Sequence, residues 1–125
     1  MGLEGGSVTQ VHGNVYVVEM SAIQDKFETA VLEAVDNGIA VLGESVRDAL
    51  NYHVERIFGI RREEIPNKLE AFHEALEHLL GEGARVVERL IVKSLYGRLS
   101  VDFEEHQDWE LVDYVNYAAK AKGGH

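Results

Sequence analysis

Apolar side chains recur every three or four positions over most of this 125-residue chain. That spacing places them on one face of an α-helix, so the chain is predicted to be mainly α-helical. The helices are expected over residues 21–38, within 39–59, from 67 to 80, over 84–96 and over 102–121. Because the intervening segments are short, consecutive helices should pack side by side.

Local signals set the expected ends of these helices. Ser21 and Asn67 are each followed three residues later by Gln or Glu, which is the spacing of a capping box at a helix start. Asn37-Gly38 and Gly97 are expected to end the first and fourth helices, and residues 60–66 to form a linker.

The beginning of the chain has a different pattern. Two short runs rich in β-branched residues, 8–12 and 15–19, flank Gly13-Asn14, a pair suited to a two-residue turn. A β-hairpin is therefore predicted over residues 8–19. The predicted fold is a single domain, mainly α, with four to five helices and this short N-terminal β-hairpin.

The apolar helix faces also predict the core. It should contain large side chains from the first four helices: Phe27, Val31, Leu50, Ile57, Phe72, Leu76, Val87, Leu90, Ile91 and Leu95.

Composition narrows the class of protein. The chain has no cysteine, and its 22 acidic and 12 basic residues give a net charge of −10. Disulfides and thiolate metal sites are thereby excluded, and a cytoplasmic location is expected. No segment has the length and apolarity of a membrane helix, and residues 1–7 lack the pattern of a signal peptide. The acidic excess disfavours nucleic acid and anionic lipid as partners.

Histidine and glutamate side chains form the first candidate site. Glu70 and His73 have the Glu-x-x-His spacing of metal-binding helical bundles, and His78 follows on the same predicted helix. His53 on the second helix, or His106, could complete a metal site. The alternative is structural, with a solvated polar face on the third helix and a hydrogen-bonded histidine at position 53.

A basic strip forms the second candidate. Arg85, Arg89 and Lys93 share one face of the predicted fourth helix, and Arg98 follows it. The strip could pair with acidic residues of the same chain, dock an acidic protein partner, or contact nucleic acid.

Four aromatic residues near the end of the chain, Phe103, Trp109, Tyr114 and Tyr117, are expected to fill the core or to form a protein contact. No motif for a catalytic nucleophile, a zinc protease or a phosphate-binding loop occurs. No catalytic residue and no cofactor are therefore predicted.

Several blocks between residues 42 and 99 resemble one archaeal family. They are Leu42-Gly43-Glu44-Ser45-Val46, Asn51 to Ile60, Arg62 to Pro66, Phe72 to Leu76, Leu80 to Ala84 and Glu88 to Tyr96. This stretch is similar to the Nitrosopumilus output domain of the fifth type, which occurs alone or attached to signalling modules. The resemblance implies a helical module in the archaeal cytoplasm with a regulatory or interaction role, and it supplies no catalytic residues.

The first functional hypothesis is therefore a non-enzymatic regulatory or protein-interaction module that self-associates, for example as a homodimer. The alternatives are a metal-binding helical protein that uses the histidines and glutamates, and a transcription-associated domain that uses the basic strip.

Overall fold

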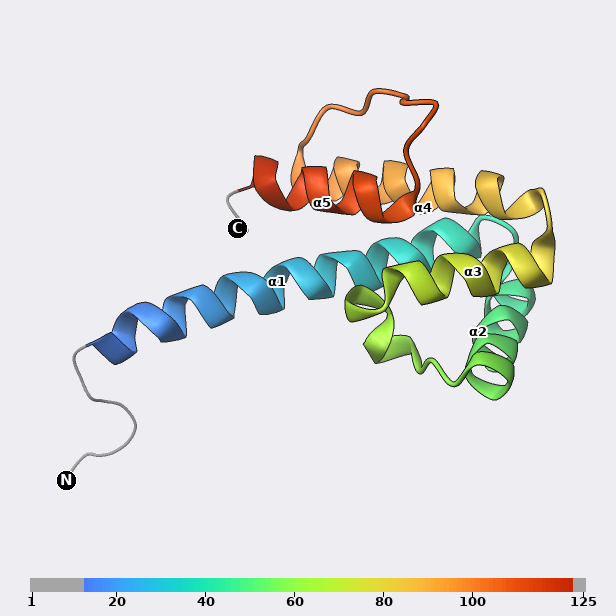
Figure 1. Ribbon diagram of the computed structural model, residues 1–125, viewed down its shortest axis with the longest axis horizontal. Helices are drawn as coiled ribbons and strands as arrows, with labels where there is room; N and C mark the ends of the chain where they lie inside the picture. The colour runs from blue at the N-terminus through green and yellow to red at the C-terminus, as the bar shows by residue number, and fades with distance from the viewer. Residues whose placement is uncertain (1–12, 123–125) are drawn as a thin grey trace.

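The longest helix, α1 (Gly13–Ala40), runs through the middle of the molecule, and its first turns extend beyond the other helices (Figure 1). The structure is a computed structural model that describes the backbone of residues 13–122 and the side chains of residues 25–122. Over that range it contains helices and no strand, so the prediction of a mainly α-helical fold is confirmed. The other elements are α2 (Glu44–Phe58), η1 (Arg62–Asn67), α3 (Leu69–Leu80), α4 (Gly83–Leu99) and α5 (Leu111–Ala121).

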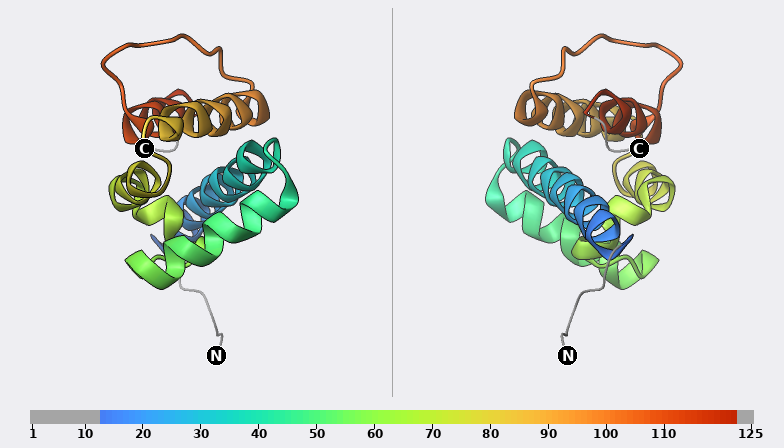
Figure 2. Two further views of the ribbon diagram at one scale, coloured as in Figure 1. Left: turned by 90° about the vertical axis from the view of Figure 1, so that its right-hand side faces the viewer. Right: turned by 90° about the vertical axis from the view of Figure 1, so that its left-hand side faces the viewer.

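α4 is the central helix of the packing, because α1, α3 and α5 all pack against it. The views of Figure 2 show α4 and α5 side by side on one side of α1, and α2 on the other side. The segment between α4 and α5, here called the 100–110 loop, arches away from the body on the side opposite α2 (Figures 1 and 2).

The core lies among α1, α3, α4 and α5. Its largest fully buried side chains are Tyr114, Phe72, Ile39, Ile65, Leu76, Ile91, Leu95, Leu111, Val31, Val35 and Val92. Most of the predicted core is confirmed, whereas Phe27 and Leu90 are only partly buried. Ile57 was wrongly predicted to be buried, since 56% of it is exposed on the outer side of α2.

α1 passes through Asn37-Gly38 and ends at Ala40, so the predicted stop at this pair is wrong. Gly38 is buried against α4, and a Cβ built there would lie 2.8 Å from both the Cα and the backbone nitrogen of Ile91. Glycine is present here because the two helix backbones nearly touch. The turn into α2 comes later, at Gly43, whose φ of 115° favours glycine.

α5 begins at Leu111, nine residues after the predicted start at Asp102. α4 continues past Gly97 to Leu99 and is ended by Ser100, which has a φ of 58°. The 100–110 loop then separates the two helices. The N–H of Glu110 donates a 2.9 Å hydrogen bond to the carboxylate of Asp113, which fixes the new start.

Residues 60–66 form more than a linker. Ile60 and Ile65 are buried, and Ile65 belongs to the short helix η1, which packs against α1 and α3. The guanidinium of Arg62 forms a forked ion pair with Asp36 of α1, at 3.0 and 2.5 Å to one carboxylate oxygen. Asn67 ends η1, and Lys68 takes the N-cap position of α3 that was predicted for Asn67.

The predicted β-hairpin over residues 8–19 lies in part outside the described residues. Residues 8–12, its first strand, are not described, and residues 13–19 form the first turns of α1 in the structure. The hairpin itself stays a prediction. None of the helices over residues 13–122 combines the length and the apolarity needed to cross a membrane.

We expect Gly38→Ala to destabilise the fold by about 1–3 kcal/mol, because a methyl group cannot enter the contact without moving α1 away from α4. Gly97→Ala is the matched control, since a Cβ there meets nothing within 4 Å. It should stabilise α4 by about 0.5–1 kcal/mol through helix propensity. Urea denaturation measures both, and equal effects of the two substitutions would contradict the close-contact role of Gly38.

Candidate functional site

One charged side chain is buried among residues 25–122, the carboxylate of Glu88 on α4. Its Oε2 lies 2.5 Å from Nδ1 of His73 on α3. The other ring nitrogen of His73, Nε2, lies 3.4 Å from Oε2 of Glu77. The imidazole therefore bridges two carboxylates, one from each helix, with its side chain only 17% exposed.

The environment shifts both members of this pair in the same direction. Burial raises the pKa of Glu88, and the nearby charges of Glu77 and Glu110 add to the effect, although the contact with His73 acts against it. Burial alone would lower the pKa of His73, but the hydrogen bond and charge of Glu88, with Glu77 and Glu110, outweigh it and raise the pKa. The folded protein therefore holds protons at this pair more tightly than the unfolded chain.

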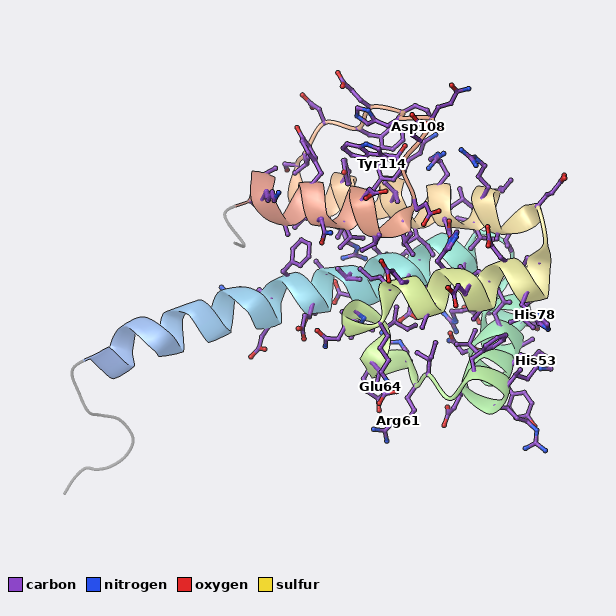
Figure 3. The ribbon with its side chains drawn as sticks, in the orientation of Figure 1. His53, Arg61, Glu64, His78, Asp108 and Tyr114 are labelled. Carbon is purple, nitrogen blue, oxygen red and sulfur yellow. The ribbon has the colours of Figure 1, made fainter. Side chains whose placement is uncertain are left out.

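The other predicted metal ligands do not join this pair. Over the described residues, no group of three or more histidine and acidic side chains is placed to hold a metal ion. Glu70 and His78 are exposed on α3, and the ring of His78 meets the ring of Phe58 edge-on at 5.4 Å. His53 is exposed on α2, beside Tyr52. Figure 3 shows His53 and His78 at the α2 end of the molecule, away from the 100–110 loop.

Arg85 and Arg89 of the basic strip hold the 100–110 loop against α4. Arg85 donates a 3.1 Å hydrogen bond to the carbonyl oxygen of Gln107. Arg89 forms a 2.5 Å ion pair with Glu105 and lies over the ring of Tyr114, 5.1 Å from its centre.

Lys93 and Arg98 also have partners within the chain. The ammonium of Lys93 lies 5.5 Å from the ring centre of Phe103, and Arg98 pairs with Glu33 of α1 at 2.6 Å. The basic strip thus contacts acidic and aromatic groups of the same chain, which is the structural alternative considered for it.

Two tyrosine hydroxyls form hydrogen bonds to backbone groups, and that of Tyr114 also holds the 100–110 loop in place. Tyr114 of α5 is fully buried, and its hydroxyl accepts a 2.8 Å hydrogen bond from the N–H of His106 and donates one of 3.0 Å to the carbonyl oxygen of His106. Tyr96 of α4 donates a 2.7 Å hydrogen bond to the carbonyl oxygen of Tyr114. Burial, followed by the neighbouring Tyr117 and Tyr114, raises the pKa of Tyr96 to about 12, so its hydroxyl stays protonated.

Exposed apolar side chains on the outer side of α2 form a further surface feature. Val46 and Ile57 are 40% and 56% exposed, and Ala49 and His53 lie exposed between them. The four positions are spaced three or four apart, so they share one helix face. We call these four residues the outer stripe of α2.

Sequence reasoning named His73 but missed Glu88 as its partner. A signal was present, because Glu88 falls on the apolar stripe of α4 between Ala84 and Ile91, and a carboxylate at a core position needs a partner. The outer stripe of α2 was missed because Ile57 was assigned to the core.

Comparisons with protein-family models, with curated proteins and with solved structures find no match to this chain.

Because the pKa of both His73 and Glu88 is raised in the folded protein, its stability should depend on pH. Because the folded state binds more protons, the free energy of unfolding should fall as the pH rises above the ordinary values of 4.5 for Glu88 and 6.5 for His73. Glu88→Gln should reduce this fall, since it removes the carboxylate and the main cause of the raised pKa of His73. Chemical denaturation between pH 5 and pH 8.5 measures the difference from the unchanged protein, on the order of tenths to a few kcal/mol.

Ala71→Gln, an exposed change on the same helix that involves no titratable group, is the control and should leave the pH dependence as it is. If Glu88→Gln and the unchanged protein show parallel curves, the pair does not titrate as described.

Removal of the Tyr114 hydroxyl should loosen the 100–110 loop. Tyr114→Phe leaves both the N–H and the carbonyl of His106 without their partner, at a cost of about 1–3 kcal/mol. Hydrogen exchange of the His106 amide should speed up with little change in α4. Tyr117→Phe on the same helix, where the ring is half exposed, should have no such effect. Unchanged exchange at His106 in Tyr114→Phe would show that the loop is held by other contacts.

Proposed function

We propose that this protein is a non-catalytic regulatory module that pairs with a second copy of itself through the outer stripe of α2. The observation that carries the proposal is an apolar face on α2 that no part of the described chain covers.

α2 is apolar over about half of its circumference. Leu50 and Val54 are buried against the body, whereas Val46 and Ile57 on the adjoining face are exposed. Apolar area left in water costs about 25 cal/mol per Å2 relative to burial, so a continuous exposed face favours association. Leu42, in the turn before α2, is a further exposed apolar residue, with 44% of it exposed.

A second copy fits the stripe because the stripe is nearly symmetric end to end. It runs from Val46 through Ala49 and His53 to Ile57, with a bulky aliphatic residue at each end. If two α2 helices pair antiparallel about a two-fold axis, Val46 of each copy meets Ile57 of the other. A two-fold interface requires this kind of self-complementary surface.

Charge opposes a second copy only weakly at this place. α2 carries Glu44, Asp48 and Glu55 against Arg47 and Arg56, a net charge of −1, so two copies of it repel one another weakly. Most of the net charge of −10 lies elsewhere in the chain.

The size of the surface suggests reversible pairing. A 15-residue helix is about 22 Å long at 1.5 Å per residue, and one of its faces is smaller than the roughly 800 Å2 per partner of a standard stable interface. Pairing that depends on protein concentration is suited to regulation.

The resemblance of residues 42–99 to the Nitrosopumilus output domain of the fifth type supports the same role, because those domains accompany signalling modules in archaea. The contacts of the candidate residues support a role without catalysis. His73 and Glu88 contact each other, and Arg85 and Arg89 contact the 100–110 loop.

Sedimentation velocity over a concentration series tests the pairing. The unchanged protein should shift from monomer to dimer as its concentration rises, and the double substitution Val46→Asp with Ile57→Asp should remain a monomer. Salt should strengthen the pairing, because it screens the repulsion between two copies of charge −10.

Val86→Asp is the matched control, since Val86 is 61% exposed on α4 and lies outside the stripe. It should dimerise like the unchanged protein. The proposal is wrong if the unchanged protein is a monomer at all concentrations, or if all three proteins associate equally. Circular dichroism confirms that each variant keeps its helical content.

A further inference from the structure

A cavity of about 340 Å3 lies between the 100–110 loop and the helices α4 and α5. Its volume is at the lower end of the range for small-molecule sites. Four rings and two carboxylates line it: Tyr96, Asp102, Glu104, His106, Trp109 and Tyr117. The two helices and the loop each supply at least one ring, so the cavity exists only because the loop is held in its arch.

The rings pack against one another as a continuous wall. His106 and Trp109 stack with their ring centres 3.8 Å apart at an angle of 18°, and Trp109 lies 5.8 Å from Tyr117. Tyr117 in turn stacks on Tyr96, with 6.4 Å between ring centres. Because Tyr114 binds both backbone groups of His106, the loop side of this wall is fixed before any ligand arrives.

The charge of the cavity is negative. Asp102 and Glu104 are exposed, Glu104 with 83% of its side chain in solvent, and no lysine or arginine is among the lining residues. The negative faces of aromatic rings attract cations as well, most strongly the face of tryptophan. The residues of the cavity therefore favour a positive ligand and oppose an anionic one.

Two neighbouring rings outside the cavity lining already contact cations. Arg89 lies over Tyr114 and Lys93 over Phe103, both from α4. These two basic side chains stay outside the cavity lining.

From this arrangement we propose that the cavity binds a small organic cation through a methylated ammonium group. A metal ion needs several converging oxygen or nitrogen ligands, whereas the wall offers ring faces and only two outer carboxylates. A methylated ammonium carries its charge on apolar methyl groups, which make contact with ring faces at little desolvation cost. The 100–110 loop, which supplies four of the lining residues, lies on the side of the molecule opposite α2 (Figure 2), so this inference is independent of the proposed pairing.

Trp109 is the only tryptophan of the chain, so its fluorescence reports directly on the cavity. The probe is choline, and its neutral isostere 3,3-dimethyl-1-butanol has the same shape without the charge. Choline should change the fluorescence of Trp109 saturably at constant ionic strength, and the neutral alcohol should not. The same response to both ligands, or no saturable response to choline, would overturn the proposal.

Substitution of Asp102 and Glu104 tests whether their carboxylates contribute to choline binding. The double substitution Asp102→Asn with Glu104→Gln should weaken choline binding about fivefold or more, because both charges that attract the cation are lost. Asp108→Asn is the matched control, since Asp108 is exposed on the same loop but does not line the cavity (Figure 3). It should leave the affinity unchanged. Equal effects of the two variants would show general attraction to an acidic surface and would contradict a defined site.

Discussion

The close contact between α1 and α4 at Gly38 and Ile91 is the constraint on which the rest of the structure depends. The two backbones approach so nearly that even one Cβ on Gly38 would lie 2.8 Å from the backbone of Ile91. This approach lets Val35 and Ile39 of α1 become almost fully buried. It also fixes α4 as the element around which α3 and α5 are placed.

The remaining faces of α4 determine what the polar residues do. Toward α3, Glu88 meets His73, and toward the 100–110 loop, Arg85 and Arg89 meet backbone and carboxylate oxygens. These contacts join parts of the chain that are far apart in sequence. In a chain with no cysteine and no metal cluster over its described residues, they take the place of covalent or metal cross-links. The outer stripe of α2 is not covered by the described part of the chain, and it is the surface through which pairing is proposed.

The sequence predicted the helices well where burial on one face imposes a three-to-four spacing, as along α3 and α4. It failed where a local signal had a different cause. Gly38 was read as a helix end, although its lack of a side chain serves the contact with α4. The start of α5 was placed too early, because the 100–110 loop is held by Tyr114 and the basic strip, and these are long-range contacts.

The candidate sites could be predicted only in part for the same reason. His73 stood out by its spacing from Glu70, but its partner Glu88 lies 15 residues further on and comes close only through the packing of α3 on α4. Ile57 was assigned to the core because α2 is apolar over a wide arc. The spacing of apolar residues along a helix shows how wide its apolar face is. It does not show which part of that face is buried by the rest of the chain.

In the proposed dimer, the outer stripe of α2 in one chain packs against the same stripe in the second chain. Because the chain has no cysteine, a single His53→Cys substitution near the expected two-fold axis supplies one thiol per chain for a short bifunctional maleimide. Ala71→Cys, at an exposed position of α3, is the comparison. His53→Cys should give cross-linked dimers in high yield and Ala71→Cys few, and equal yields from the two positions would contradict pairing through the outer stripe of α2.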